Sequence, residues 1–184
     1  MAVARERGRY FLPDLEITRM RRRHLRKVLS IEGRVYPRPW SASLFLAELS
    51  QRNARAYMVA KHGNEVVGYA GMMFTGSDAH VTNIAVDPDF HGYKVGSRLL
   101  LTLITEAIAR GAESISLEVR ASNRIAQSMY EKFGFKGAGV RRGYYIETNE
   151  DALVMVVESA HSAEFRVMLQ TVREELDRLG GGRA

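Results

Sequence analysis

The stretch of residues 81–135 constrains the fold more than any other part of the chain. Its apolar residues recur first with the spacing of a buried strand and then with the i, i+3/i+4 spacing of a helix, and this order repeats once. In the second strand, Ile115, Leu117 and Val119 alternate with polar residues, which predicts two different faces. The predicted elements are strands at residues 81–86 and 115–119 and helices at residues 96–109 and 125–133.

The flanking segments supply further strands and helices. Two β-rich runs joined by His62-Gly63-Asn64 predict a hairpin. Pro37 and Pro39 end the preceding helix because proline lacks an N–H donor, and Ser41 or Ser43 is suited to cap the next one. Strands that alternate with helices after an antiparallel hairpin favour a mixed α/β sheet. The remaining strands are predicted at residues 15–17, 56–61, 66–74, 136–142 and 152–157.

Three parts are expected along the chain: a flexible basic arm at residues 1–14, a folded domain at residues 15–158 and a C-terminal amphipathic helix at residues 159–184. The helix either packs on its own domain or contacts a second subunit or partner. Its apolar stripe consists of Phe165, Met168, Leu169, Val172, Leu176 and Leu179.

Composition narrows the class of protein. A chain of 184 residues with 46% hydrophobic and 26% charged residues is typical of one globular domain. No apolar run approaches the roughly 20 residues of a membrane span, and the N-terminus lacks the apolar core of a signal peptide. The absence of cysteine excludes disulfides, thiolate metal sites and a cysteine acyl intermediate. We therefore expect a cytoplasmic protein.

Positive charge is concentrated near the N-terminus. Residues 1–30 hold nine Lys/Arg and three Asp/Glu, while the remainder holds 18 of each, so the net charge of +6 lies in this segment. Such a segment is either a solvated tail with one helix face or a surface that attracts RNA. Without an aromatic-interleaved platform, direct nucleic-acid binding is not expected, although the basic segment leaves it open.

The amino-acid sequence of the central segment is similar to that of a known protein family. Residues 81–100 read VTNIAVDPDFHGYKVGSRLL and residues 115–135 read ISLEVRASNRIAQSMYEKFGF. This order resembles the GNAT superfamily of acyl-CoA-dependent N-acyltransferases. LEVRASN and MYEKFGF, followed by RRGYY and EDALVM, resemble the RimI-type protein N-terminal acetyltransferases in particular. The resemblance covers about residues 15–158. It implies the GNAT fold, a mixed sheet of six to seven strands with splayed middle strands and flanking helices, and acetyl-CoA as cosubstrate.

The same resemblance places the pyrophosphate of the cosubstrate at the start of the central helix, where main-chain N–H groups and the helix dipole favour anions. The family has Gln/Arg-x-x-Gly-x-Gly/Ala there. In this chain His91 replaces the first residue and Lys94 replaces the middle glycine, which restricts the backbone but adds a cation. The implied phosphate-binding residues are His91, Gly92, Tyr93, Lys94, Val95, Gly96 and Ser97.

Further residues are implied for the pantetheine arm. Main-chain groups of Ile84, Ala85 and Val86 would bind it as an added strand, and the Val86 N–H would polarise the thioester carbonyl. Asn123 would hydrogen-bond the arm; apart from the resemblance it reads as a helix-start residue.

The resemblance also assigns the proton transfers. Glu118 would be the general base for the attacking amine, and Tyr130 would protonate the leaving sulfur. Because no covalent nucleophile is suggested, we expect direct transfer in a ternary complex.

On the acceptor side, Tyr144 would hydrogen-bond the incoming N-terminal residue and Tyr145 would flank it, while Ile146 stands where the family often has proline. Glu147, Glu150 and Asp151 either attract a cationic acceptor or are ordinary surface acids. The implied acceptor is the N-terminal alanine of a small-subunit ribosomal protein, and other protein N-termini stay open. Two alternatives stay open: a lysine or small-amine acetyltransferase, and a catalytically inactive CoA-binding or ribosome-associated module. The five histidines lack metal-ligand spacing, so no metal site is predicted.

Overall fold

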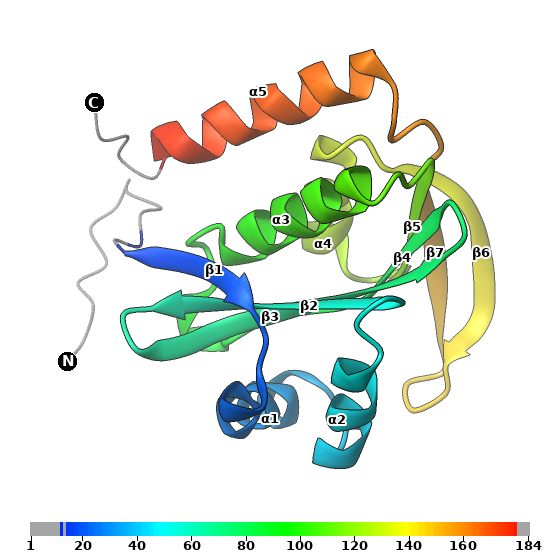
Figure 1. The fold of residues 1–184 in the computed structure, drawn as a ribbon. Coiled ribbons are helices and arrows are strands. Elements are labelled where there is room, and N and C mark those ends of the chain that lie inside the picture. Colours follow the sequence, from blue (N-terminus) through cyan, green and yellow to red (C-terminus); the bar gives the residue numbers. More distant parts are fainter. Residues whose placement is uncertain (1–11, 13, 180–184) are drawn as a thin grey trace.

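The computed structural model describes residues 12 and 14–179, which form a seven-stranded sheet with helices on both faces (Figure 1). The predicted arm at residues 1–14 thus lies mostly outside the described residues. The elements in chain order are β1 (Leu15–Arg19), η1 (Arg22–His24), α1 (Leu25–Val35), α2 (Ala42–Ser50), β2 (Arg55–His62), β3 (Glu65–Thr75), β4 (Asp78–Val86), η2 (Pro88–Phe90), α3 (Val95–Ala109), β5 (Ser114–Arg120), α4 (Arg124–Lys132), β6 (Lys136–Tyr145), β7 (Glu150–Val157) and α5 (Ala163–Leu179).

The sheet is mixed. Its strand order is β1-β2-β3-β4-β5-β7-β6. β4 and β5 pair in parallel, and the other neighbouring strands pair antiparallel. The parallel pair is joined through α3, as a crossover connection requires. The predicted mixed α/β fold is confirmed, with seven strands.

Two hydrophobic clusters cover the two faces of the sheet. On one face, α3 buries an apolar stripe that includes Leu99, Leu103 and Ile104. On the other face, α1 and α2 contribute Val28 and Phe45 to a second cluster. Figure 1 shows α1 and α2 on one side of the sheet and α3 and α5 on the other. Side chains that alternate along a strand therefore enter different cores.

The predicted caps and turns explain several boundaries. The Ser41 hydroxyl accepts a hydrogen bond from Leu44 N at 3.2 Å and caps α2. α1 ends at Val35, before the prolines. Gly63, in the β2–β3 hairpin, has a φ of 57°, and Gly134, after α4, has a φ of 83°; both angles are in the region that favours glycine.

The C-terminal helix packs on its own domain. α5 lies beside α3 (Figure 1), with Phe165, Leu169 and Leu176 buried. Nη2 of Arg98 on α3 donates to the Leu176 carbonyl at 2.6 Å, near the end of α5. In the described part of the chain, no helix has both the length and the apolar character needed to span a bilayer.

Candidate active site

The candidate site begins where β4 and β5 separate. Their pairing is recorded for residues 78–81 of β4 with residues 114–117 of β5. The pairing of β4 with β3 continues further, to Val86 opposite Gly68. β4 therefore runs on beyond its parallel partner, and a gap opens between the two middle strands.

The direction of the β4 main chain decides which groups face this gap. Asp87 N donates to the Val67 carbonyl of β3 at 2.9 Å. Because alternate residues of a strand direct their main-chain groups to opposite sides, Ala85 faces β3 as Asp87 does, while Ile84 and Val86 face away from it. Of the three residues implied for the pantetheine arm, only Ile84 and Val86 therefore direct main-chain groups to the gap. The main-chain groups of Ala85 face β3 instead.

Two side chains confirm this direction. The Tyr36 hydroxyl donates to the Ile84 carbonyl at 3.1 Å, and Nε2 of His91 lies 3.1 Å from the Val86 carbonyl, to which it donates. His91, which departs from the family pattern, therefore folds back onto the end of β4 and fixes the loop that follows. Tyr36, which sequence reasoning did not select, reaches the gap from the end of α1.

The loop before α3 has the geometry of an anion-binding site. Arg98 N donates to the Lys94 carbonyl at 3.0 Å, so the N–H groups of Val95, Gly96 and Ser97 precede the first bond of the helix ladder. A Cβ on Gly96 would lie 3.7 Å from Val86 Cγ2, which places this helix end against β4. Main-chain donors of the loop thus lie next to the gap.

Lys94 carries the main irregularity of the loop. It has φ 59° and ψ 19°, the left-handed conformation that favours glycine, and it precedes the first residue of α3. Gly92 is also at positive φ, 88°. Tyr93 is half-buried and packs against the α3 core cluster. The loop therefore carries backbone strain at Lys94, in a conformation that a glycine would adopt freely.

Glu118 lies on the face of β5 opposite its core residues, as predicted, and its carboxylate has two partners. Oε2 lies 2.9 Å from Nε2 of His80, and Oε1 lies 3.3 Å from Nη2 of Arg141. The Glu118 side chain is 9% exposed. Nδ1 of His80 lies 2.9 Å from the Ser116 hydroxyl. A carboxylate with a histidine beside it suits proton transfer.

Neither His80 nor Arg141 was selected from the sequence. From the sequence, His80 is only one of five histidines without metal-ligand spacing. The parallel register places it opposite Ser116 and beside Glu118. The detectable signal was its position between the core residues Ala79 and Val81, which puts it on the polar face of β4.

Tyr130 lies on α4, buried in the α3-side core and in edge contact with Phe135. Burial raises the pKa of the Tyr130 phenol, so it stays protonated across neutral pH. Burial also raises the pKa of Tyr36, and the nearby Tyr130 and Tyr145 add to that shift. The three phenols are therefore close enough to influence one another.

Asn123 begins α4. Its Oδ1 accepts a hydrogen bond from Ala126 N at 3.1 Å, which makes it the N-cap of this helix. The cap occupies one acceptor of the side chain, and its amide NH₂ remains a donor for any ligand.

The β6–β7 hairpin carries Tyr144 and Tyr145, whose rings meet edge to face at 5.1 Å. Tyr144 is 44% exposed. The Arg120 guanidinium stacks on Tyr145, 3.9 Å from the ring centroid. Burial is the main cause that raises the pKa of Tyr145 to about 12. The hairpin thus presents one open and one anchored tyrosine.

The acidic residues of this hairpin serve its own structure. Glu147 and Glu150 pair with Arg120 at 2.6 and 3.2 Å. Asp151 Oδ1 accepts a hydrogen bond from Gly143 N at 2.8 Å. Arg120 and the Gly143 N–H thus hold these acids within the hairpin.

Trp40 packs rather than pointing into the gap. Its ring lies 5.3 Å from that of Phe45, and its main-chain N–H donates to Oε1 of the buried Glu32 at 3.0 Å. Burial raises the pKa of Glu32.

Among residues 12 and 14–179, no cluster of three or more His, Asp or Glu has the arrangement of a metal site.

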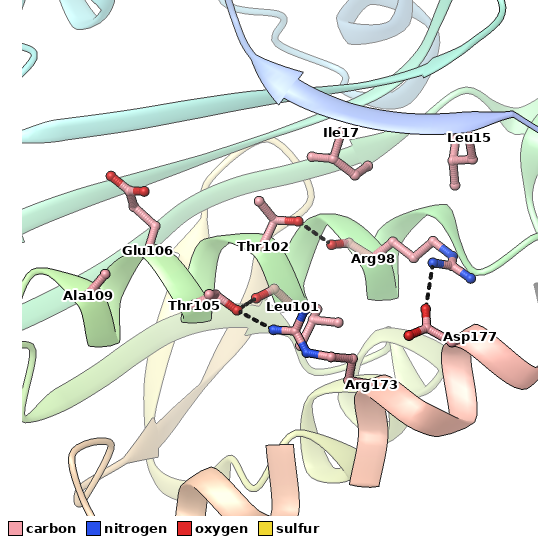
Figure 2. Close-up of a pocket in the computed structure, with 10 residues that line it drawn as sticks. All are labelled: Leu15, Ile17, Arg98, Leu101, Thr102, Thr105, Glu106, Ala109, Arg173 and Asp177. Atoms are coloured by element: carbon pink, nitrogen blue, oxygen red, sulfur yellow. Dashed lines mark hydrogen bonds and ion pairs between the residues drawn. The ribbon is translucent and has the colours of Figure 1, made fainter. Parts of the chain in front are cut away.

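A separate cavity of about 350 Å³ lies between β1, α3 and α5 (Figure 2). Arg98, Thr105, Glu106, Arg173 and Asp177 form its polar walls, and Arg173 donates to the Thr105 hydroxyl at 3.2 Å. None of the candidate site residues lines it. This cavity is therefore separate from the candidate site at the gap between β4 and β5.

Comparison with known proteins agrees with this geometry. Residues 25–135 match the family described as Acetyltransferase (GNAT) family. The chain belongs to the GNAT acetyltransferases. Its relatives are N-acetyltransferases, so the resemblance read from the sequence is confirmed.

Within the GNAT family, the chain is similar to enzymes that modify a ribosomal protein. The ribosomal protein bS18-alanine N-acetyltransferase of Salmonella typhimurium is 37% identical over 129 residues, which cover 69% of this chain and 86% of the relative. The crystal structure of the ribosomal-protein-S18-alanine N-acetyltransferase from Escherichia coli has a TM-score of 0.73 at 32% identity, covering 82% of this chain and 97% of that chain.

A more distant neighbour shares the fold. The PaiA N-acetyltransferase from Thermoplasma acidophilum, in complex with coenzyme A, has a TM-score of 0.67 at 18% identity and covers 79% of this chain and 99% of that chain.

Proposed function

We propose that this GNAT acetyltransferase transfers the acetyl group of acetyl-CoA to the α-amine of a protein N-terminus, with the N-terminal alanine of ribosomal protein bS18 as the acceptor. The names of its relatives support this acceptor. An acceptor of that kind also supports a cytoplasmic location. The single observation that carries the proposal is Glu118, a nearly buried carboxylate held by His80 beside the gap between β4 and β5.

The donor side of this gap fits acetyl-CoA. Ile84 and Val86 direct main-chain groups to the side of β4 that no longer pairs with β5. An extended ligand there would form hydrogen bonds with β4 as an added strand does. The N–H groups that begin α3 would bind the pyrophosphate. The Val86 N–H would polarise the thioester carbonyl and stabilise the oxyanion that forms on attack.

Glu118 would accept the proton of the attacking amine. Because a carboxylate oxygen accepts, the Nε2–H of His80 donates to Glu118, and Nδ1 on the other side of the ring lies beside the Ser116 hydroxyl. His80 thus fixes Oε2, and the acceptor amine would approach Oε1, the oxygen that pairs with Arg141 in the structure. The amine then attacks the thioester directly.

Tyr130 would return a proton to the sulfur. Its raised pKa keeps the phenol protonated before the reaction, so it holds the proton that the leaving sulfur takes. Tyr130 then regains a proton and Glu118 releases one to solvent. Since the chain has no cysteine, no thiol competes for the acyl group. The departing CoA and the acetylated N-terminus therefore leave without a covalent enzyme intermediate.

Tyr36, Tyr144 and Tyr145 would bound the acceptor groove. Tyr36 comes from the end of α1 and the other two from the β6–β7 hairpin, so the groove would lie between these elements and lead to Glu118. Phenols offer both an apolar ring and a hydrogen bond, which suits the first residues of a peptide.

The test is a panel of acceptors with the purified full chain and acetyl-CoA, followed by thiol release and mass spectrometry. It uses a peptide with the bS18 N-terminus, the same peptide with a blocked N-terminus and a free lysine, and a polyamine. Acetylation of the α-amine alone is expected. Turnover on lysine or polyamine only would replace the proposed acceptor. Acetyl-CoA binding without turnover on any of them would favour an inactive binding module.

A further inference from the structure

Arg141 occupies the oxygen of Glu118 that His80 leaves open. Its Nη2 lies 3.3 Å from Oε1, while His80 lies 2.9 Å from Oε2. The two ends of the Arg141 ion pair differ in environment: the arginine side chain is 59% exposed and the glutamate side chain is 9% exposed. An exposed cation thus covers a nearly buried carboxylate.

The sheet explains how Arg141 reaches this position. β7 lies between β5 and β6, with Val154 opposite Glu118 and Ala152 opposite Arg141. The arginine side chain therefore crosses a neighbouring strand to reach the carboxylate. Its guanidinium also lies 5.6 Å from the centroid of the Tyr144 ring. This distance is within cation–π range, so the Tyr144 ring can bind the guanidinium when it leaves Glu118.

The acceptor arrives with a charge of its own. An α-amine has a pKa of about 7.7–8.0, so most of it is ammonium at neutral pH. Approach of this ammonium to Glu118 while Arg141 stays would put two cations on one oxygen. If Arg141 left without a replacement, a nearly buried carboxylate would lose a partner, which is unfavourable. Exchange of one cation for the other avoids both costs.

We propose that Oε1 of Glu118 is the binding subsite for the α-ammonium of the acceptor, and that Arg141 holds this subsite until the acceptor displaces it. The inference rests on the proposed function, because it names where the acceptor's charge binds in that reaction. Arg141 then competes with the acceptor and takes no part in the chemical step. The subsite selects a cationic terminus over a blocked one.

The test compares Arg141→Gln with Arg142→Gln. Arg142 is the next residue of β6 and is exposed, and no ion pair with Glu118 is found for it among the described residues. Both variants remove one positive charge from the same strand, so a general effect of net charge appears in both. kcat and KM are measured with the free-N-terminal peptide, and acetyl-CoA affinity by calorimetry.

Removal of the competitor is expected to lower the peptide KM by roughly two- to fivefold in Arg141→Gln, the range for a solvent-exposed ion pair, with kcat and acetyl-CoA affinity little changed. Arg142→Gln should match the wild type. A higher KM or a lower kcat in Arg141→Gln would overturn the proposal, because Arg141 would then hold the peptide or orient Glu118. An equal fall in KM in both variants would overturn it as well.

A binding measurement separates this inference from the proposed reaction. With CoA present and no acetyl donor, the free peptide should bind Arg141→Gln more tightly than wild type, while the N-acetylated peptide should bind both equally. This holds even if turnover fails, which would count against the proposed function alone. Tighter binding of both peptides, or of neither, would refute the ammonium subsite.

Discussion

Nε2 of His80 lies 2.9 Å from Oε2 of Glu118, and this contact joins the two strands just where they begin to separate. The pairing of His80 with Ser116 is close to the end of the parallel ladder, which finishes at Val81 and Leu117. Glu118 is thus the first residue of β5 beyond the paired stretch. His80 fixes one oxygen of its carboxylate from the paired side, and Arg141 pairs with the other.

This contact predicts non-additive kinetics for the two residues. Glu118→Gln is expected to lower kcat by roughly 10²–10⁴-fold, the usual contribution of a general base. His80→Ala should lower it by about tenfold, and the double variant should be no worse than Glu118→Gln, because residues that act as a unit do not add. His161→Ala, at an exposed position, is the control. Wild-type turnover in Glu118→Gln would exclude the base role.

Tyr130→Phe separates acid catalysis from packing. The variant keeps the ring that contacts Phe135 and removes the hydroxyl. We expect kcat to fall by roughly 10²-fold or more, with the free energy of unfolding nearly unchanged. Thiol release in single turnover and urea denaturation measure the two effects. Tyr69→Phe, which removes a buried phenol from the core under α1 and α2, provides the comparison. Unchanged single-turnover rates in Tyr130→Phe would remove it from the mechanism.

Lys94→Gly should relieve backbone strain. A residue with a Cβ in the left-handed conformation destabilises the folded state by roughly 1–2 kcal/mol. Glycine removes this strain, but its greater freedom in the unfolded chain offsets part of the gain in stability. The free energy of unfolding is therefore expected to rise by roughly 0.5–1 kcal/mol, measured by urea denaturation. Lys132→Gly, at a helical position, should lower it instead. A fall in both would mean that contacts of the Lys94 side chain outweigh the strain.

Arg120 holds the β6–β7 hairpin in place. Its guanidinium stacks on Tyr145 and pairs with Glu147 and Glu150, and Nη1 donates to the Thr148 hydroxyl at 2.6 Å. Arg120→Gln should raise the peptide KM by roughly tenfold, about the loss of one charge-assisted hydrogen bond, while acetyl-CoA affinity stays the same. Arg124→Gln, at the start of α4, is the control. Loss of acetyl-CoA affinity alone would place the effect on the donor side.

Glu150 links stability to pH. The Ser122 hydroxyl and N–H donate to it, and Arg120 pairs with it, so the pKa of Glu150 is lowered. Its stabilising effect is therefore present above the unfolded pKa, about 4.3, and is lost as pH falls through the lower folded pKa. The stability difference between wild type and Glu150→Gln should shrink between about pH 6 and about pH 3 in urea denaturation. A constant difference over this range would contradict the assignment.

Much of the fold follows from local sequence. The apolar periodicity of residues 96–109 predicts α3, and the alternation around Leu117 places Glu118 on the polar face of β5. Ser41 marks the start of α2 and Gly134 the end of α4. These features could be predicted because a helix stripe, a strand face, a cap and a turn each depend on residues a few positions apart.

The partners in the site could not be predicted in this way. His80 and Glu118 come from strands separated by α3, and Arg141 reaches Glu118 across β7. Tyr36 bonds the Ile84 carbonyl from the other layer of the fold. The sequence determined the elements, their faces and the family motifs. The tertiary structure decided which charges meet, because strand register and helix docking are set by packing between distant segments, and no local spacing encodes them.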